Sequence, residues 1–152
     1  MALFAATTSG RAVANTMTTI LEINPPANRK AVVTEASVTF SGVSATDVPV
    51  LVQLCRVTAA SAAGTGVTPT DQKDTSIGAS ATAAKYLPAS EGTVVVLKQY
   101  EVPPSSGLVI QYPLGREPEI IGGAASAKGY SIRCNRGSGA AINADANIEF
   151  EE

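Results

Sequence analysis

Near its end the chain reads INADANIEF over residues 142–150. Apolar and polar side chains alternate strictly along this stretch, which is the pattern of a β-strand with one buried and one exposed face. A helix would distribute the same side chains around its circumference. Because a lone strand can neither satisfy its backbone hydrogen bonds nor cover its apolar face, segments upstream must supply partner strands. The rest of the chain is therefore interpreted as the sheet system to which this strand belongs.

Similar patterns recur upstream. The strongest is Arg29–Phe40, where Val38 and Phe40 lie on the predicted inward face. Val48–Thr58 follows after a turn-like segment, and the two stretches together predict an antiparallel hairpin. The other predicted strands are Met17–Ile23, Thr82–Tyr86, Thr93–Val102, Leu108–Tyr112, Ile120–Ile121, Gly129–Asn135 and the closing strand.

These segments predict an all-β fold, because no stretch has the period of a convincing amphipathic helix. About eight antiparallel strands with uneven connections favour a jelly-roll-like β-sandwich. The 13 Gly and 9 Pro residues punctuate the chain, as expected for short strands joined by turns. An immunoglobulin-like sandwich is the weaker alternative, because the chain has no Trp to pack on a cysteine pair.

The length of 152 residues suits one folded domain. Residues 1–15 are small and polar without clear periodicity, and are interpreted as an N-terminal arm or a loosely held first strand. Residues 16–152 are predicted to form a single β-sandwich domain. Within it, segment 59–92 is rich in Ala, Ser, Thr and Gly, and is predicted to be a long loop or excursion that has a function or carries short strands.

Composition argues against several classes of partner. The net charge is −2 and no basic run stands out, so nucleic-acid binding is not expected. The longest apolar runs, such as Val94–Leu97, are too short to span a membrane. Residues 1–11 lack a basic region followed by an apolar one, so we expect no secretory signal and synthesis in a cytoplasm.

Little in the chain suggests site chemistry, and we predict no catalytic, cofactor-binding or metal site. The absence of His removes His-based triads and His metal ligands. Cys55 and Cys134 are interpreted as buried free thiols, although sequence cannot establish how close they lie.

Calcium binding is one interpretation of the acidic residues on the closing strand. Asp145, Asn147 and Glu149 share one strand face, but alternate residues on a strand lie about 6.5–7 Å apart. Calcium holds its oxygen ligands at about 2.3–2.6 Å, so these three side chains favour a solvated or partner-facing surface. Asp71–Asp74 is interpreted as a solvated turn, because it lacks the Gly and distal Glu of an EF-hand.

Two further alternatives concern carbohydrate. Glu101, Glu117 and Glu119 are candidates for a hydrolytic carboxylate pair, but nothing in their spacing pairs them. Gly115–Glu117 is interpreted as a tight turn. Four tyrosines either line a sugar site or lie at the edge of the core, the commoner place for tyrosines in strands: Tyr86, Tyr100, Tyr112 and Tyr130.

Several stretches resemble small jelly-roll virion proteins of tailed bacteriophages. They are Pro25–Phe40, Ser41–Thr46 before Val48–Leu54, Gly107–Glu117 and Asn147–Glu152. The resemblance implies a non-enzymatic capsid decoration (cement) protein on the outer surface of a phage head, within the virion. Its implied partners are the major capsid protein and copies of itself, as a homotrimer. The alternative is a carbohydrate-binding or tail-associated sandwich module of the virion.

This interpretation predicts functions for the two segments without strong strand patterns, residues 1–15 and 59–92. We expect the arm to dock on the shell and segment 59–92 to wrap a neighbouring subunit. Neighbouring subunits would also cover exposed edge strands of the sandwich.

Overall fold

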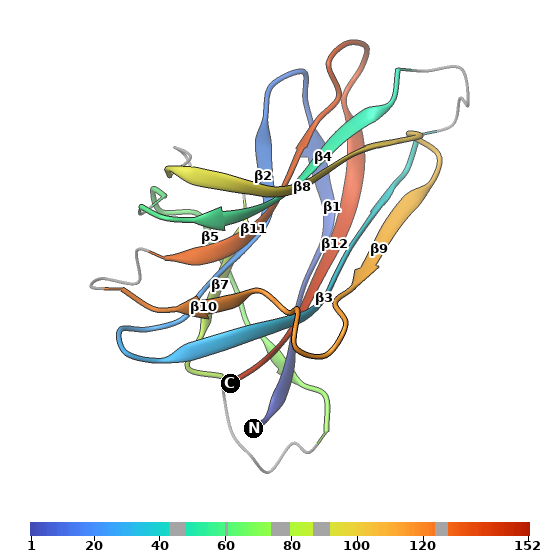
Figure 1. Cartoon of the computed structure of the whole chain (residues 1–152). Helices are drawn as coiled ribbons and strands as arrows, with labels where there is room; N and C mark the ends of the chain where they lie inside the picture. The colour runs from blue at the N-terminus through green and yellow to red at the C-terminus, as the bar shows by residue number, and fades with distance from the viewer. Residues whose placement is uncertain (43–47, 60, 74–79, 87–91, 124–127) are drawn as a thin grey trace.

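A computed structural model describes residues 1–42, 48–59, 61–73, 80–86, 92–123 and 128–152. Within these residues the chain forms twelve strands and no helix. The strands make two six-stranded antiparallel sheets in a sandwich-like arrangement (Figure 1). The predicted all-β sandwich is confirmed, whereas the finer assignment to a jelly roll stays a prediction. No helix able to cross a membrane occurs in the described ranges.

Sheet A contains both ends of the chain. Its strands are β1 (Leu3–Val13), β3 (Lys30–Phe40), β6 (Thr70–Asp71), β9 (Gly107–Gln111), β10 (Glu119–Ile121) and β12 (Ile142–Glu151). The order is β10-β3-β12-β1-β6, with β9 also paired to β3. The closing strand therefore lies in the middle of its sheet, between β3 and β1.

Sheet B contains β2 (Thr18–Asn24), β4 (Val50–Val57), β5 (Thr65–Val67), β7 (Ala83–Tyr86), β8 (Val94–Val102) and β11 (Gly129–Asn135). The order is β5-β7-β2-β11-β4-β8. The first four strands of the chain alternate between the two sheets, so consecutive strands do not form hairpins.

The core lies between the sheets and is built mainly from aliphatic side chains. Ile148 and Phe150 of β12 are buried, as are Val38 and Phe40 of β3, and this prediction is confirmed. Leu21, Ile23, Leu54, Tyr130 and Ile132 of sheet B belong to the same buried cluster. Burial of each such side chain stabilises the fold by about 1.5–3 kcal/mol relative to exposure.

Of the two interpretations of residues 1–15, the structure shows the first strand, over Leu3–Val13, and not the arm. Strand β1 pairs with β12 from Leu3↔Glu151 to Val13↔Ile142, and it also pairs with β6. Phe4 is buried and its ring stacks on that of Phe150, with centroids 5.9 Å apart. The segment is held by a backbone ladder and a buried ring, so it is part of the sandwich.

The predicted hairpin between β3 and β4 is also wrong, because these strands lie in different sheets. Both edges of β3 are occupied, by β12 on one side and by β9 and β10 on the other. Both edges of β4 are occupied as well, by β11 and β8. Most of the turn proposed between them, residues 43–47, lies outside the described residues.

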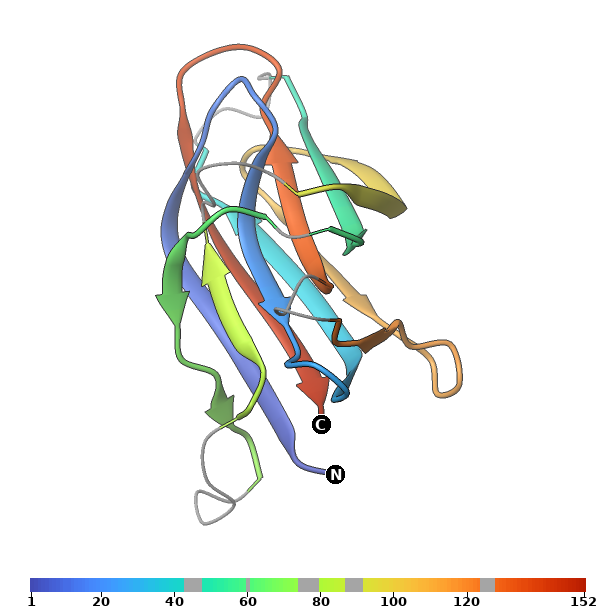
Figure 2. The same ribbon diagram turned by 90° about the vertical axis from the view of Figure 1, so that its left-hand side faces the viewer.

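Segment 59–92 carries three short strands, and the predicted strand Thr82–Tyr86 corresponds to β7. Two of them, β5 and β7, extend sheet B beyond β2, while β6 pairs with β1 of sheet A. Figure 2 shows these green strands beside the blue β1 and β2. The excursion thus adds to one edge of both sheets.

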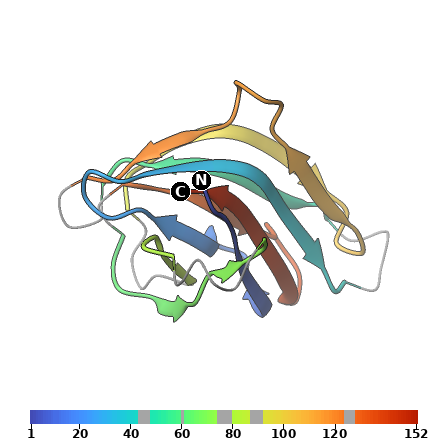
Figure 3. The ribbon, with the colours of Figure 1, turned by 90° about the horizontal axis from the view of Figure 1, so that it is seen from below.

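The two termini are tied together. Ala2 and Glu152 exchange two backbone hydrogen bonds of 3.0 and 3.1 Å, and both ends lie side by side in Figure 3. The carboxylate of Glu152 also accepts hydrogen bonds from Ala81 N and from Thr82 in the excursion. The end of the chain therefore fixes the start of β7 as well as the start of β1.

Candidate functional site

Strand β8 forms one free edge of sheet B. Within the described residues it pairs only with β4. Val95, Val96 and Leu97 are consecutive and exposed by 52%, 43% and 36%. We call this stretch, with its unpaired backbone, the β8 edge. Leu97 is an extra residue in the ladder, because Val96 pairs with Cys55 and Lys98 with Leu54.

A second apolar side chain lies on the next strand along the chain. Val109 of β9 is 59% exposed on the outward face of sheet A, opposite Ser37. β9 is also an edge strand over its length, since β3 is its one partner among the described residues. Exposed apolar residues grouped on unpaired strands are typical of surfaces that contact other proteins.

A small hollow lies where β4 ends near β10. It has a volume of about 230 Å³ and is lined by Arg56, Val57, Thr58, Glu119, Ile120, Ile121 and Lys128. Pockets for drug-sized ligands usually measure about 300–1,000 Å³. Glu119, on its wall, pairs with Lys30 at 3.1 Å. The hollow is therefore small for an organic ligand.

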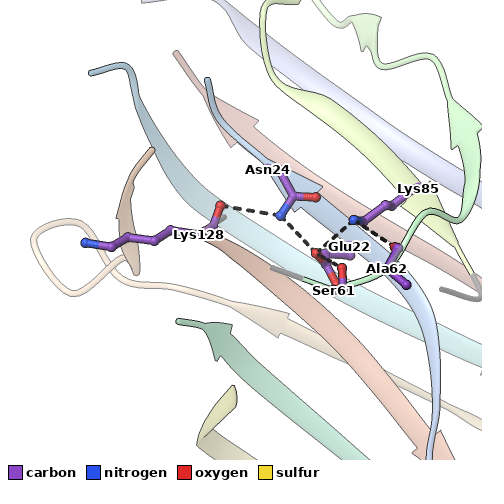
Figure 4. Close-up of polar contacts among 6 residues, drawn as sticks. All are labelled: Glu22, Asn24, Ser61, Ala62, Lys85 and Lys128. Atoms are coloured by element: carbon purple, nitrogen blue, oxygen red, sulfur yellow. Dashed lines mark hydrogen bonds and ion pairs between the residues drawn. The ribbon is translucent and has the colours of Figure 1, made fainter. Parts of the chain in front are cut away.

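A buried polar cluster lies on the outward face of sheet B. Its centre is Glu22 of β2, which is 1% exposed. Oε1 of Glu22 accepts hydrogen bonds from Ser61 Oγ at 2.8 Å and from Asn24 Nδ2 at 2.9 Å, and Lys85 Nζ lies 3.7 Å from the same atom. Figure 4 shows these contacts converging on the one carboxylate oxygen. We call Glu22, Asn24, Ser61 and Lys85 the Glu22 cluster.

The strand register explains how the cluster forms. Glu22 lies directly opposite Lys85 of β7 on one side and Ser131 of β11 on the other. The segment at Ser61 and Ala62 then lies over this face, and Lys85 Nζ donates to Ala62 O at 3.3 Å. A carboxylate buried without partners would cost several kcal/mol, so these contacts are what permit its burial.

Sequence analysis predicted a strand over Met17–Ile23, which contains Glu22, but not a buried polar site. Every residue of β2 after Thr18 is buried, because the excursion covers the outward face. The covering residues are small and come from a segment without a strong pattern. The one sequence feature that could have indicated a buried polar site is the presence of Glu22 and Asn24, two positions apart, beside the apolar Leu21 and Ile23.

The calcium candidates lie along the outward face of β12. Asp145 Oδ1 accepts a hydrogen bond from Gly10 N at 2.7 Å, and Asn147 Oδ1 accepts one from the Thr7 hydroxyl at 3.0 Å. Both side chains therefore fasten β12 to β1. Across the described part of the chain, no three possible ligands gather as a metal site would require.

The other polar candidates are dispersed. Asp71 Oδ1 accepts from Lys73 N at 2.8 Å, which makes a local turn, whereas Asp74 lies outside the described residues. Arg116 N donates to Pro113 O at 2.9 Å, and Gly115 has φ of 82°, so the predicted tight turn is present. The carboxylates Glu101, Glu117 and Glu119 lie on β8, in this turn region and on β10, respectively.

The tyrosines divide into separate places. The hydroxyls of Tyr112 and Tyr130 lie 2.8 Å apart and their rings meet edge to face. Burial raises the pKa of both phenols above the usual value. Tyr86 lies on β7 under the guanidinium of Arg11, 3.5 Å from the ring centroid, while Tyr100 packs at the core edge. The four rings do not form one sugar-binding platform.

The cysteines are buried free thiols, as predicted. They lie on neighbouring strands, where Cys55 is opposite Ser131 and Cys134 is opposite Val52. An offset of three residues places the two side chains on opposite faces of sheet B, so they cannot form a disulfide without rearrangement. Burial raises the pKa of the Cys134 thiol, which keeps it protonated.

No protein-family model matches the chain, and comparisons with curated proteins and with solved structures find no match. The function is therefore argued from the geometry of the β8 edge and from the resemblance described above.

Proposed function

We propose that this chain is a non-enzymatic structural protein that associates with copies of itself through the β8 edge. Following the resemblance to jelly-roll virion proteins, we place it as a capsid decoration protein on the outside of a phage head. Its partners in this proposal are the major capsid protein and two further copies of the chain. In this proposal the sandwich is a jelly roll and the assembly is a homotrimer.

The observation that carries the proposal is the β8 edge itself. A nine-residue edge strand that has one partner strand among the described residues, and three exposed apolar side chains, is a template for another strand. Natural edges are usually protected by charge, Pro or short length. The register shift at Leu97 blunts this edge only in part, because Val95 and Val96 remain exposed.

A second copy of the chain is the occupant that we favour. The edges β5 and β6 are three and two residues long, so neither can cover β8 along its length. Strand β9, with exposed Val109, offers a second apolar edge on the other sheet. A contact between β8 of one copy and β9 of the next joins two different surfaces, and such contacts close into a ring when the rotation between copies is one third of a turn, as the proposed trimer requires.

The polar groups give supporting evidence. Asp145 and Asn147 fasten β12 to β1, Asp71 makes a turn and Glu119 pairs with Lys30. These carboxylates and amides have structural partners, as expected for a scaffold that presents surfaces.

The test introduces a charge on the edge by the substitution Val95→Glu. Val95 lies opposite Arg56 in the ladder, so the new carboxylate has a cationic neighbour and the fold should persist. We expect the parent to have the solution mass of three chains and the variant to have the mass of one, as measured by light scattering after size-exclusion chromatography. Co-sedimentation with undecorated phage heads should fall in parallel.

The matched control is Leu114→Glu. Leu114 is 97% exposed in the turn after β9 and belongs to neither β8 nor β9, so this variant should assemble and bind heads like the parent. A parent that is monomeric both alone and on heads would overturn self-association. A parent with the mass of two chains would replace the trimer with a dimer.

A further inference from the structure

We propose that Lys85 and Asn24 become joined by an amide bond between their side chains, with Glu22 as the group that transfers the protons. This internal cross-link would tie β7, in the excursion, to β2 in the centre of sheet B. The proposal rests on the Glu22 cluster and is independent of the assembly proposed above.

The strand register brings the two reacting groups together. Lys85 lies directly opposite Glu22, and Asn24 is opposite Ala83, so Asn24 and Lys85 are diagonal neighbours on one face of antiparallel strands. Diagonal neighbours have Cα atoms about 7–8 Å apart, a gap that a lysine side chain can bridge. The Lys85 amine and the Asn24 carboxamide both contact Oε1 of Glu22, at 3.7 and 2.9 Å (Figure 4).

The side chains of the Glu22 cluster are shielded from water, which holds the reacting groups in place. Glu22 and Asn24 are buried, and Lys85 is largely covered by the segment at Ser61 and Ala62. The backbone carbonyl of Lys128 also accepts from Asn24 Nδ2 at 3.4 Å, which helps to orient the carboxamide. Reactants fixed in a site gain the entropic advantage of an intramolecular reaction.

The chemistry balances without any co-reactant. The Lys85 ammonium gives a proton to the Glu22 carboxylate, and the free amine attacks Cγ of Asn24 to form a C–N bond. Glu22 then returns a proton to Nδ2 as the Cγ–Nδ2 bond breaks, and ammonia leaves. The remaining proton from the attacking nitrogen leaves with the ammonia as ammonium. Glu22 ends as it began, so it acts as a general base and then as a general acid.

The residue after Asn24 closes a competing route. Asparagine commonly loses ammonia when the next backbone nitrogen attacks its side chain. That residue is Pro25, whose nitrogen carries no hydrogen and is already fully substituted. Lys85 is thus the proposed nucleophile, because its amine and this carboxamide share Oε1 of Glu22.

The experiment measures the intact mass of the full chain, purified, folded, aged and then denatured. We expect a mass lower than that of the encoded sequence by one ammonia. Trypsin does not cleave after a modified lysine, so digestion should yield residues 12–29 joined to residues 74–98. Fragmentation of this species should locate the bond between Asn24 and Lys85.

Three variants should retain the full encoded mass: Lys85→Arg, Asn24→Ala and Glu22→Gln. The first keeps a cation beside Glu22, so it is the variant best able to fold without the bond. The control is Lys128→Arg, because Lys128 touches Asn24 through its backbone and its side chain is exposed. This control should lose ammonia as the parent does, and circular dichroism should show that each variant is folded.

Some results would overturn the assignment. A parent with the unmodified mass after prolonged incubation excludes the bond. Ammonia loss that persists in Lys85→Arg excludes Lys85 as the nucleophile. Loss of one water instead of one ammonia would place the amide on a carboxylate, such as that of Glu22, and not on Asn24.

Discussion

Strands β1 and β12 are the first and last strands of the chain, and they lie side by side in the middle of sheet A. Only β12 has the alternating sequence pattern that is typical of a strand. β12 has strict alternation over residues 142–150, while β1 reads as a run of small and polar residues. Both are long, both are paired on two sides, and both contribute a buried ring to the core.

The difference lies in a bulge. Between Thr8↔Ala146 and Arg11↔Ala144, two residues of β1 oppose the single residue Asp145 of β12. Thr8 and Val13 are therefore both buried although they are five positions apart, which breaks the period of two. A strand that carries a bulge loses the pattern by which strands are recognised, although it loses few of its hydrogen bonds.

The largest expected effect comes from deletion of residues 1–11. Were the segment an arm, the truncated protein would melt like the parent and lose only its docking function. Because β1 supplies the ladder partner of β12 and buries Phe4 and Ala6, we expect the truncation to abolish cooperative unfolding. Circular dichroism during heating measures the cooperativity of unfolding. A melting curve identical to that of the parent would support the interpretation of this segment as an arm.

A smaller effect should follow from removing either of the stacked rings. Phe150→Ala should cost about 3–5 kcal/mol, the usual range for a buried Phe. Phe4→Ala should cost a similar amount, because Phe4 is buried against Phe150. The control is Leu3→Ala, a half-exposed neighbour on the other face of β1, which should cost less. Urea denaturation gives the three values, and a Phe4→Ala variant as stable as the parent would contradict the equivalence of β1 and β12.

Much of the fold was nevertheless predictable from local pattern. The alternation of β12 identified the inward positions Ile148 and Phe150, and Val38 with Phe40 followed from the same rule. Pairing was less predictable, because register and neighbours depend on contacts distant in sequence. The β3–β4 hairpin failed for this reason, since other strands occupy both edges of each partner.

The buried polar cluster was the least predictable feature. Glu22 and Asn24 have the spacing of an exposed strand face, and only the excursion at Ser61 converts that face into an interior. Burial of a side chain by a patternless segment depends on tertiary structure, which alternation along one strand does not report. The β8 edge was visible as an apolar run, but its exposure at Val95 and Val96 depends on which strand ends the sheet.

The smallest expected effect on stability concerns Gly10, which lies in the bulge of β1. It has φ of 64°, in the left-handed region, and its amide donates to Asp145 Oδ1 at 2.7 Å. A Cβ added there meets no atom within 4 Å, so Gly10→Ala incurs backbone strain without a clash. Left-handed backbone costs an L-residue about 1–2 kcal/mol. Ala also lowers the conformational entropy of the unfolded chain, which stabilises the folded state by about 0.4–1 kcal/mol and offsets part of the strain.

We therefore expect Gly10→Ala to destabilise the fold by about 1 kcal/mol. The matched control is Gly66→Ala on β5, where a Cβ also meets no atom within 4 Å and the backbone has no positive φ. That variant should be neutral or slightly more stable, because it receives the entropic gain without the strain. Equal stability of the two variants in urea denaturation would show that β1 accommodates its extra residue without a left-handed glycine. The bulge seen in the register would then not depend on the conformation of Gly10.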